Sequence, residues 1–124
     1  HQRMSDTLKI LYVDDEKINR FVFDKLMSRK YHVITAEDGP SALKIIEEHH
    51  DFEYIVSDMR MPVMNGLEFI TRVKEKRPAM KCYILTGYSI NEDIEAALNS
   101  GLILDYWTKP ADFEMIDKVL QDSY

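Results

Sequence analysis

The chain has a single cysteine and lacks any long apolar run. One cysteine cannot form a disulfide within the chain, and its place in the apolar segment Cys82-Tyr83-Ile84-Leu85 is typical of a small core residue. A reducing, cytoplasmic location fits this composition. No apolar stretch approaches the roughly 20 residues that cross a bilayer, and the N-terminus lacks the apolar region of a secretory signal. These absences predict a soluble protein that is neither membrane-bound nor exported.

Basic charge is also scarce. Lysine and arginine total 16 residues against 22 acidic residues, which leaves a formal charge of -6. That balance argues against direct binding to nucleic acid or to an anionic membrane surface. The length of 124 residues and the hydrophobic share of 45% are typical of one domain with one core. We expect a single domain over residues 4–124, and we interpret residues 1–3 as a cloning remnant or the end of an upstream segment.

Short apolar runs alternate along the chain with longer stretches of helical periodicity. The runs predict strands at residues 9–13, 32–36, 54–57, 82–86 and 104–108. Apolar residues recur with helical spacing within residues 18–27, 42–46, 67–73, 92–99 and 113–120. This order predicts an α/β fold in which helices cover both faces of a parallel sheet. No linker, repeat or low-complexity tract interrupts it.

Polar side chains lie at the carboxyl ends of four of the five predicted strands. In chain order they are Asp14, Asp15, Asp58, Thr86 and Lys109, and Gly87 follows Thr86. Ligands of open α/β sheets bind outside the carboxyl ends of the strands. Because the strands are parallel, we expect these acids, hydroxyl and amine to meet at one edge of the sheet. They are the groups that phosphoryl chemistry needs.

Three aspartates held together would repel one another, and a hard divalent cation with oxygen ligands relieves that repulsion. Magnesium is the expected ion, because it keeps coordination positions open for water and phosphate oxygen. One carboxylate can then act as a nucleophile, while Thr86 and Lys109 donate to the phosphoryl oxygens. Gly87, which has no side chain, would leave the backbone accessible to that group.

These residues resemble the receiver domain of two-component response regulators, and the resemblance covers residues 8–120. The motifs that carry it are Tyr12-Val13-Asp14-Asp15-Glu16, Asp58-Met59-Arg60-Met61-Pro62 with Asn65-Gly66 beyond, Thr86-Gly87, and Tyr106 ahead of Lys109-Pro110. The resemblance implies a flavodoxin-like (βα)5 doubly wound parallel sheet with strand order 2-1-3-4-5. It also implies a chemotaxis-receiver-like signalling switch rather than an enzyme, with its own phosphorylation and dephosphorylation chemistry.

The resemblance assigns a role to each residue of the predicted metal site. It implies that Asp58 is the phosphorylated residue, and that Asp15, Asp58 and the backbone carbonyl of Arg60 bind magnesium directly. Asp14 would act mainly through bound water. The phosphoryl group would come from a sensor histidine kinase or a phosphotransfer protein.

The resemblance also implies how phosphorylation changes the surface. Thr86, Gly87 and Lys109 would surround the phosphoryl oxygens, Thr86 would be drawn toward them, and Tyr106 would turn inward behind it. The surface of the fourth helix, fifth strand and fifth helix would then change and meet an output domain or effector. The Lys109–Pro110 peptide bond is cis in the family, which sequence alone only makes possible.

Two departures from the common receiver pattern are informative. The segment Leu102-Ile103-Leu104-Asp105 is one residue longer than usual, as in receivers often joined to kinase or cyclic-dinucleotide phosphodiesterase modules. Arg60 and Tyr88 place bulk two positions after Asp58 and Thr86. That bulk would shield an acyl phosphate from water and favour a long-lived phosphorylated state.

Other interpretations explain less of the sequence. A haloacid-dehalogenase-type phosphatase needs a second acid two residues after its nucleophile, where this chain has Arg60. A flavodoxin-like electron carrier needs a phosphate-binding loop where the acidic run 14–16 would repel phosphate. A receiver that only binds partners would not need the complete site. Tyr106 could be plain core packing, as we expect for Trp107.

Overall fold

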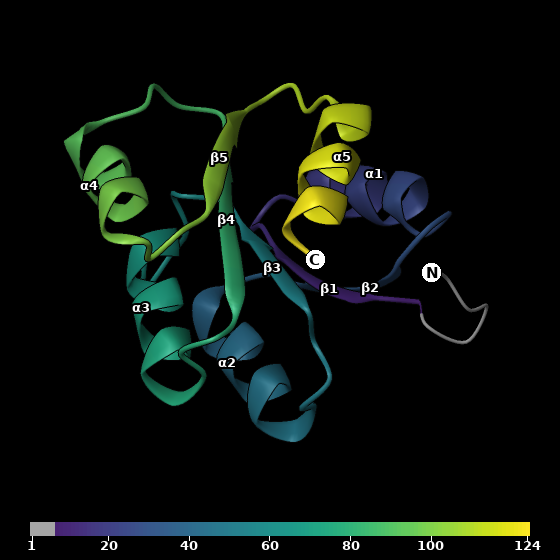
Figure 1. Cartoon of the computed structure of the whole chain (residues 1–124), viewed down its shortest axis with the longest axis horizontal. Coiled ribbons are helices and arrows are strands. Elements are labelled where there is room, and N and C mark those ends of the chain that lie inside the picture. The colour runs from purple at the N-terminus through teal and green to yellow at the C-terminus, as the bar shows by residue number, and fades with distance from the viewer. Residues whose placement is uncertain (1–6) are drawn as a thin grey trace.

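The structure, a computed structural model, describes residues 7–124. Residues 1–3 and the first three residues of the expected domain lie outside the described part. Five strands alternate with five helices (Figure 1). In chain order they are β1 (Lys9–Val13), α1 (Lys17–Met27), β2 (His32–Ala36), α2 (Gly39–Glu48), β3 (Tyr54–Ser57), α3 (Gly66–Lys76), β4 (Lys81–Thr86), α4 (Glu92–Ser100), β5 (Asp105–Thr108) and α5 (Phe113–Ser123).

The strands form one parallel sheet in the order β2-β1-β3-β4-β5, which confirms the expected doubly wound fold. β1, β3 and β4 are buried on both faces, as their nearly continuous apolar sequences predict. β2 and β5 form the edges and are partly exposed, although both are as short as the buried central strands. β5 begins one residue later than predicted, because Leu104 is 47% exposed and pairing with β4 starts at Asp105.

Helices cover the two faces of the sheet unequally, with α2, α3 and α4 on one face and α1 and α5 on the other (Figure 1). The alternation of side chains along each strand divides the core accordingly. Leu11, Ile55 and Ile84 pack under the three-helix layer. Tyr12, Tyr54, Tyr83 and Trp107 pack under the two-helix layer. Burial of each large side chain contributes about 1.5–3 kcal/mol.

A row of aromatic rings crosses the sheet beneath α5. Ring centroids are 6.2 Å apart for Tyr31 and Tyr54, 6.3 Å for Tyr54 and Tyr83, and 5.2 Å for Tyr83 and Trp107. Buried phenols need hydrogen-bond partners, and α5 provides them at successive turns. Tyr31 bonds to the Asp117 carboxylate and Tyr54 to the Leu120 carbonyl. Tyr83 bonds to the Ser123 hydroxyl. These bonds fix the position of α5 along the sheet.

Local signals set where the helices begin and end. The side chain of Asn65 accepts a hydrogen bond from the backbone of Glu68, and Glu68 accepts one from the Asn65 N–H, which closes a capping box at the start of α3. Gly101 ends α4 with φ of 82°, a left-handed conformation that favours glycine. Within residues 7–124, none of the helices is long and apolar enough to cross a membrane.

Candidate functional site

The sheet itself places the predicted site residues. Asp58 follows β3, and its N–H donates to the Val13 carbonyl at the end of β1 at 2.8 Å. Lys109 follows β5, and its N–H donates to the Thr86 carbonyl at the end of β4 at 2.7 Å. Both bonds extend the parallel ladder one residue beyond the strands. The backbones of the site are therefore held as firmly as the strands that precede them.

Three aspartates and one lysine meet at this edge. One carboxylate oxygen from each of Asp14, Asp15 and Asp58 lies within 4.8 Å of the others. The Lys109 ammonium lies 2.7 Å from Asp14 Oδ2 and 3.3 Å from Asp58 Oδ2. Asp14 and Asp58 are buried, whereas Asp15 is exposed. Hard oxygen donors at this spacing fit a magnesium ion, so these three residues are the group that would hold one.

Burial and charge shift the pKa values of this cluster. Burial raises the pKa of the Asp58 carboxyl, the Lys109 charge opposes that shift, and the charge of Asp14 adds to it. Burial alone would lower the pKa of Lys109, but its hydrogen bond to Asp14 and the two carboxylate charges raise it above its ordinary value. Although it contacts a cation, Asp58 therefore resists ionisation, because burial outweighs the ion pair. A second cation would favour the charged form.

The start of α3 packs directly against Asp58 and Met59. The Met59 N–H donates to Asp58 Oδ1 at 2.7 Å, and the Gly66 N–H donates to the Met59 carbonyl at 2.7 Å. A methyl group at position 66 would lie 2.2 Å from the Asp58 carbonyl oxygen. The glycine of the Asn65-Gly66 motif is therefore required by close approach of the two backbones. The sequence signals a turn there but not this contact.

A cleft of about 540 Å³ opens above these acids. It is lined by Asp15, Glu16, Asp58, Arg60, Met61, Pro62, Gly87, Tyr88 and Lys109. The Arg60 guanidinium lies over the Tyr88 ring, 4.1 Å from its centroid, so the two bulky residues predicted to shield Asp58 contact each other. A methyl group at Gly87 would meet Lys109 Cδ at 3.7 Å, an ordinary contact. Space alone does not require glycine at that position.

The predicted switch residues lie behind the cleft. Thr86 is fully buried, and its hydroxyl oxygen accepts from the Tyr88 N–H at 3.2 Å. Tyr106 lies half-buried on β5, and its hydroxyl donates to Glu95 Oε2 on α4 at 3.2 Å. That bond holds the ring toward α4. Trp107 is buried on the opposite face, as expected. The Lys109–Pro110 peptide bond is cis.

The sequence did not predict a hydrogen bond between Tyr12 and Asp14. The Tyr12 hydroxyl donates to Asp14 Oδ2 at 2.7 Å, and burial, together with the nearby Asp14 charge, raises the pKa of this phenol. The Tyr12 ring stacks on Phe23 with centroids 4.0 Å apart. One signal was present in the sequence: a residue two positions before Asp14 on a strand shares its face.

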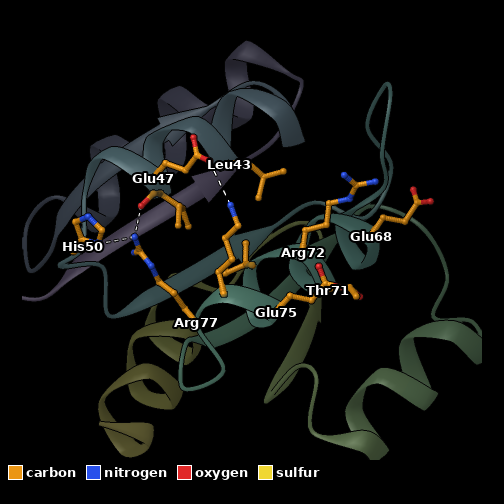
Figure 2. A pocket seen from close by; sticks show the side chains of 11 residues that line it. Leu43, Glu47, His50, Glu68, Thr71, Arg72, Glu75 and Arg77 are labelled. Atoms are coloured by element: carbon orange, nitrogen blue, oxygen red, sulfur yellow. Dashed lines mark hydrogen bonds and ion pairs between the residues drawn. The ribbon is translucent and has the colours of Figure 1, made fainter.

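A second hollow, about 940 Å³ in volume, lies between α2 and α3 (Figure 2). Leu43 from α2 and Val73 from α3 are among its apolar lining residues. At one end, the Arg77 guanidinium donates to the backbone carbonyls of Ile46, in the last turn of α2, and of His49, the residue that follows α2. Carbonyls at the C-terminal end of a helix lack partners within it. These contacts join two helices, and nothing in them resembles a reactive site.

Comparisons with known proteins agree on one family. Residues 10–121 match the response regulator receiver domain. The transcriptional regulatory protein ZraR of Escherichia coli K12 is 33% identical over 94% of this chain, which spans only 26% of ZraR. An uncharacterized 14.6 kDa protein of Leptolyngbya boryana is 37% identical over 92% of this chain and 88% of its own length. The chain thus spans about a quarter of the length of the transcriptional regulators that it matches.

Solved structures give the same result. Chemotaxis protein CheY4 of Vibrio cholerae superposes with a TM-score of 0.80 at 32% identity, covering 94% of this chain and 98% of CheY4. The response regulator TrrA of Thermotoga maritima, solved in complex with Mg2+ and BeF, has a TM-score of 0.79 at 27% identity, with the same coverage of 94% and 98%. This chain belongs to the response regulator receiver domains of two-component signalling systems.

Proposed function

We propose that this receiver domain is a phosphorylation-controlled switch whose phosphoacceptor is Asp58. One observation carries the proposal: the Lys109 ammonium bridges Asp14 and Asp58 inside a group of three acids whose oxygens lie within 4.8 Å of one another. An acid cluster with a built-in cation is what acyl phosphate formation on a carboxylate requires. The receiver fold is that of a signalling domain rather than of a classical enzyme.

Magnesium would be held by Asp14, Asp15, Asp58 and the backbone carbonyl of Arg60. Bound there, it would neutralise charge on the carboxylates and on the transferring phosphoryl group. An Asp58 carboxylate oxygen forms the new P–O bond, and the bond from phosphorus to the donor breaks. The electron pair of that bond stays with the donor, which takes up a proton from solvent. Lys109 stabilises the phosphoryl oxygens, because its flexible chain already reaches Asp58 at 3.3 Å.

The output of this chemistry would be a change on the α4-β5-α5 face. Thr86 ends β4 and is fully buried, so a displacement of its hydroxyl toward a phosphoryl oxygen would vacate space behind it. On the neighbouring strand β5, Tyr106 pairs with Ile84 of β4, and Ile84 is two residues before Thr86. Tyr106 would turn into that space, and its bond to Glu95 on α4 would break. α5 keeps its aromatic anchors and would move least.

The contact between Arg60 and Tyr88 supports a long-lived phosphorylated state. Hydrolysis of an acyl phosphate needs a water molecule in line with the P–O bond. The two side chains line the cleft and stack at 4.1 Å, so they reduce the room for such a water. The same arginine argues against a haloacid-dehalogenase-type phosphatase, because a guanidinium does not act as a general acid at neutral pH.

A protein donor fits the surface beside the cleft. Asp15 and Glu16 line the cleft, and α1 starts directly after them. Ile18 and Phe21, one helical turn apart, are 64% and 60% exposed. Exposed apolar side chains on the helix that follows these acids suit a phosphohistidine-bearing protein, either a sensor histidine kinase or a phosphotransfer protein. An output domain or effector would read the α4-β5-α5 face.

Acetyl phosphate with magnesium tests the phosphoacceptor assignment, and intact mass is the readout. We expect one added phosphoryl group on the parent chain, none after Asp58→Asn, and none on the parent in EDTA. Asp117→Asn is the matched control, since Asp117 also contacts a lysine, at 2.7 Å, but lies on α5. It should be labelled like the parent. Labelling that persists in Asp58→Asn would contradict the assignment.

A further inference from the structure

Asp14 has two donors on one oxygen. Its Oδ2 accepts from the Tyr12 hydroxyl at 2.7 Å and from the Lys109 ammonium at 2.7 Å. Its Oδ1 accepts from the Glu16 N–H at 2.9 Å. We propose that Tyr12 is a positioning residue for phosphorylation: its hydroxyl retains Asp14 Oδ2 while Lys109 moves from Asp14 to the phosphoryl oxygens on Asp58. This inference rests on the proposed function.

The two donors differ in their freedom to move. Tyr12 is 1% exposed, sits inside β1, and its ring stacks on Phe23 with an interplanar angle of 0°. Its hydroxyl therefore cannot follow a ligand into the cleft. The Lys109 side chain is 20% exposed, lines the cleft and has a flexible four-carbon stem. Of these two donors to Asp14 Oδ2, only Lys109 can leave.

The departure of Lys109 would be unfavourable without a second donor. Asp14 is fully buried, and a buried carboxylate oxygen that loses its hydrogen bonds is strongly destabilised. In the resting state Lys109 lies closer to Asp14 than to Asp58, at 2.7 Å against 3.3 Å. Without the phenol, Lys109 would be held by Asp14 more strongly. The phosphoryl group would then bind more weakly, although the metal ligands remain in place.

Tyr12→Phe tests this, because it removes the hydroxyl and keeps the stacked ring. Calorimetric titration would give two constants for each variant: magnesium affinity alone, and beryllofluoride affinity at saturating magnesium. We expect about tenfold weaker beryllofluoride binding, the effect of one hydrogen bond to a charged group, with magnesium affinity changed less than about twofold. Tyr54→Phe is the matched control: it also removes a buried phenol hydroxyl from this core, one bonded to Leu120 on α5. Both its affinities should stay within about twofold of the parent.

Three outcomes would overturn the inference. They are unchanged beryllofluoride affinity in Tyr12→Phe, equal weakening of both ligands in it, and equal weakening of beryllofluoride binding in Tyr54→Phe. A parent chain that fails to bind beryllofluoride would instead contradict the proposed function. An independent measurement uses the parent alone. NMR would follow the exchange of the Tyr12 hydroxyl proton with solvent, first with magnesium and then after adding beryllofluoride. The proton should stay protected in both conditions. Fast exchange after beryllofluoride is added would overturn the inference.

Discussion

Replacing Asp58 by asparagine is expected to stabilise the chain in the absence of metal. The Asp58 carboxylate is 5% exposed and lies in a cluster with the Asp14 charge. Asparagine keeps the shape of the side chain and an oxygen that can accept from the Met59 N–H. It removes a buried charge that magnesium would otherwise compensate. The variant should therefore gain stability while it loses the proposed phosphoacceptor, an exchange found at many functional sites.

The size of this gain follows from the distances. At an effective dielectric constant of about 20, unit charges at the 4.8 Å limit of the acid cluster repel by at least about 3.5 kcal/mol, and unit charges 3.3 Å apart attract by about 5 kcal/mol. The attraction to Lys109 therefore exceeds the repulsion from Asp14 by at most about 1.5 kcal/mol. The burial penalty of an ion, several kcal/mol, then decides the sign. We expect a net gain of about 2 kcal/mol, or about 8 °C in melting temperature for a chain of this size.

Thermal melts in EDTA between pH 4 and pH 8 measure this gain. The folded-state pKa of Asp58 is raised above its unfolded value of about 3.9, mainly by burial. As the pH falls through the folded-state pKa, the folded parent takes up a proton that the unfolded chain does not. The parent therefore gains stability toward acid, and the advantage of Asp58→Asn should narrow. A parent more stable than the variant at pH 7 would refute this reasoning.

Asp117→Asn should show the opposite sign and serves as the control for this experiment. Burial alone would raise the pKa of Asp117, but hydrogen bonds from Lys30 and Tyr31 lower this pKa below its ordinary value. Its charge therefore stabilises the fold at neutral pH, and that contribution is lost as the pH falls through the lowered pKa. The variant should melt below the parent at pH 7, and the two should converge in acid.

Three further substitutions test single contacts. Gly66→Ala should destabilise the chain by about 3 kcal/mol in urea titrations, because its methyl group would lie 2.2 Å from a backbone oxygen; a loss below about 0.5 kcal/mol would contradict that. Tyr88→Ala frees Arg60 from its stacked position, so the phosphoryl group should be lost several-fold faster by intact mass; an unchanged rate would exclude shielding. Glu95→Gln weakens the acceptor of Tyr106, and beryllofluoride should bind about threefold tighter by calorimetry; weaker binding would argue against a resting-state restraint.

The fold could be predicted closely because its signals are local. Apolar runs and turn residues located all five strands, and each begins within one residue of its predicted start. The family resemblance supplied the strand order, which local patterns do not contain. Local patterns also do not show which strands are exposed, since the exposure of β2 and β5 depends on which strands lie outermost. The aromatic anchors of α5 were also out of reach, because Tyr31 and Asp117 are 86 positions apart.

The site was predictable in its members but not in its contacts. Side chains at the ends of parallel strands must meet, so Asp14, Asp58 and Lys109 could be grouped from sequence. The Lys109 ammonium lies 2.7 Å from Asp14 Oδ2 and 3.3 Å from Asp58 Oδ2. No sequence pattern encodes a difference of this size. The bond between Tyr106 and Glu95 joins a strand to a helix and depends on how α4 packs.

The most direct test of the account couples both ends of the proposed switch in one measurement. Amide NMR spectra of the parent and of Thr86→Ala would be recorded with magnesium, before and after adding beryllofluoride. In the parent we expect shifts around Asp58 and also around Tyr106 and along α4, while the C-terminal half of α5 changes least. In Thr86→Ala the shifts around Asp58 should remain and those around Tyr106 should largely disappear. Equal changes around Tyr106 in both proteins, or none in the parent, would contradict a switch that runs from Asp58 through Thr86.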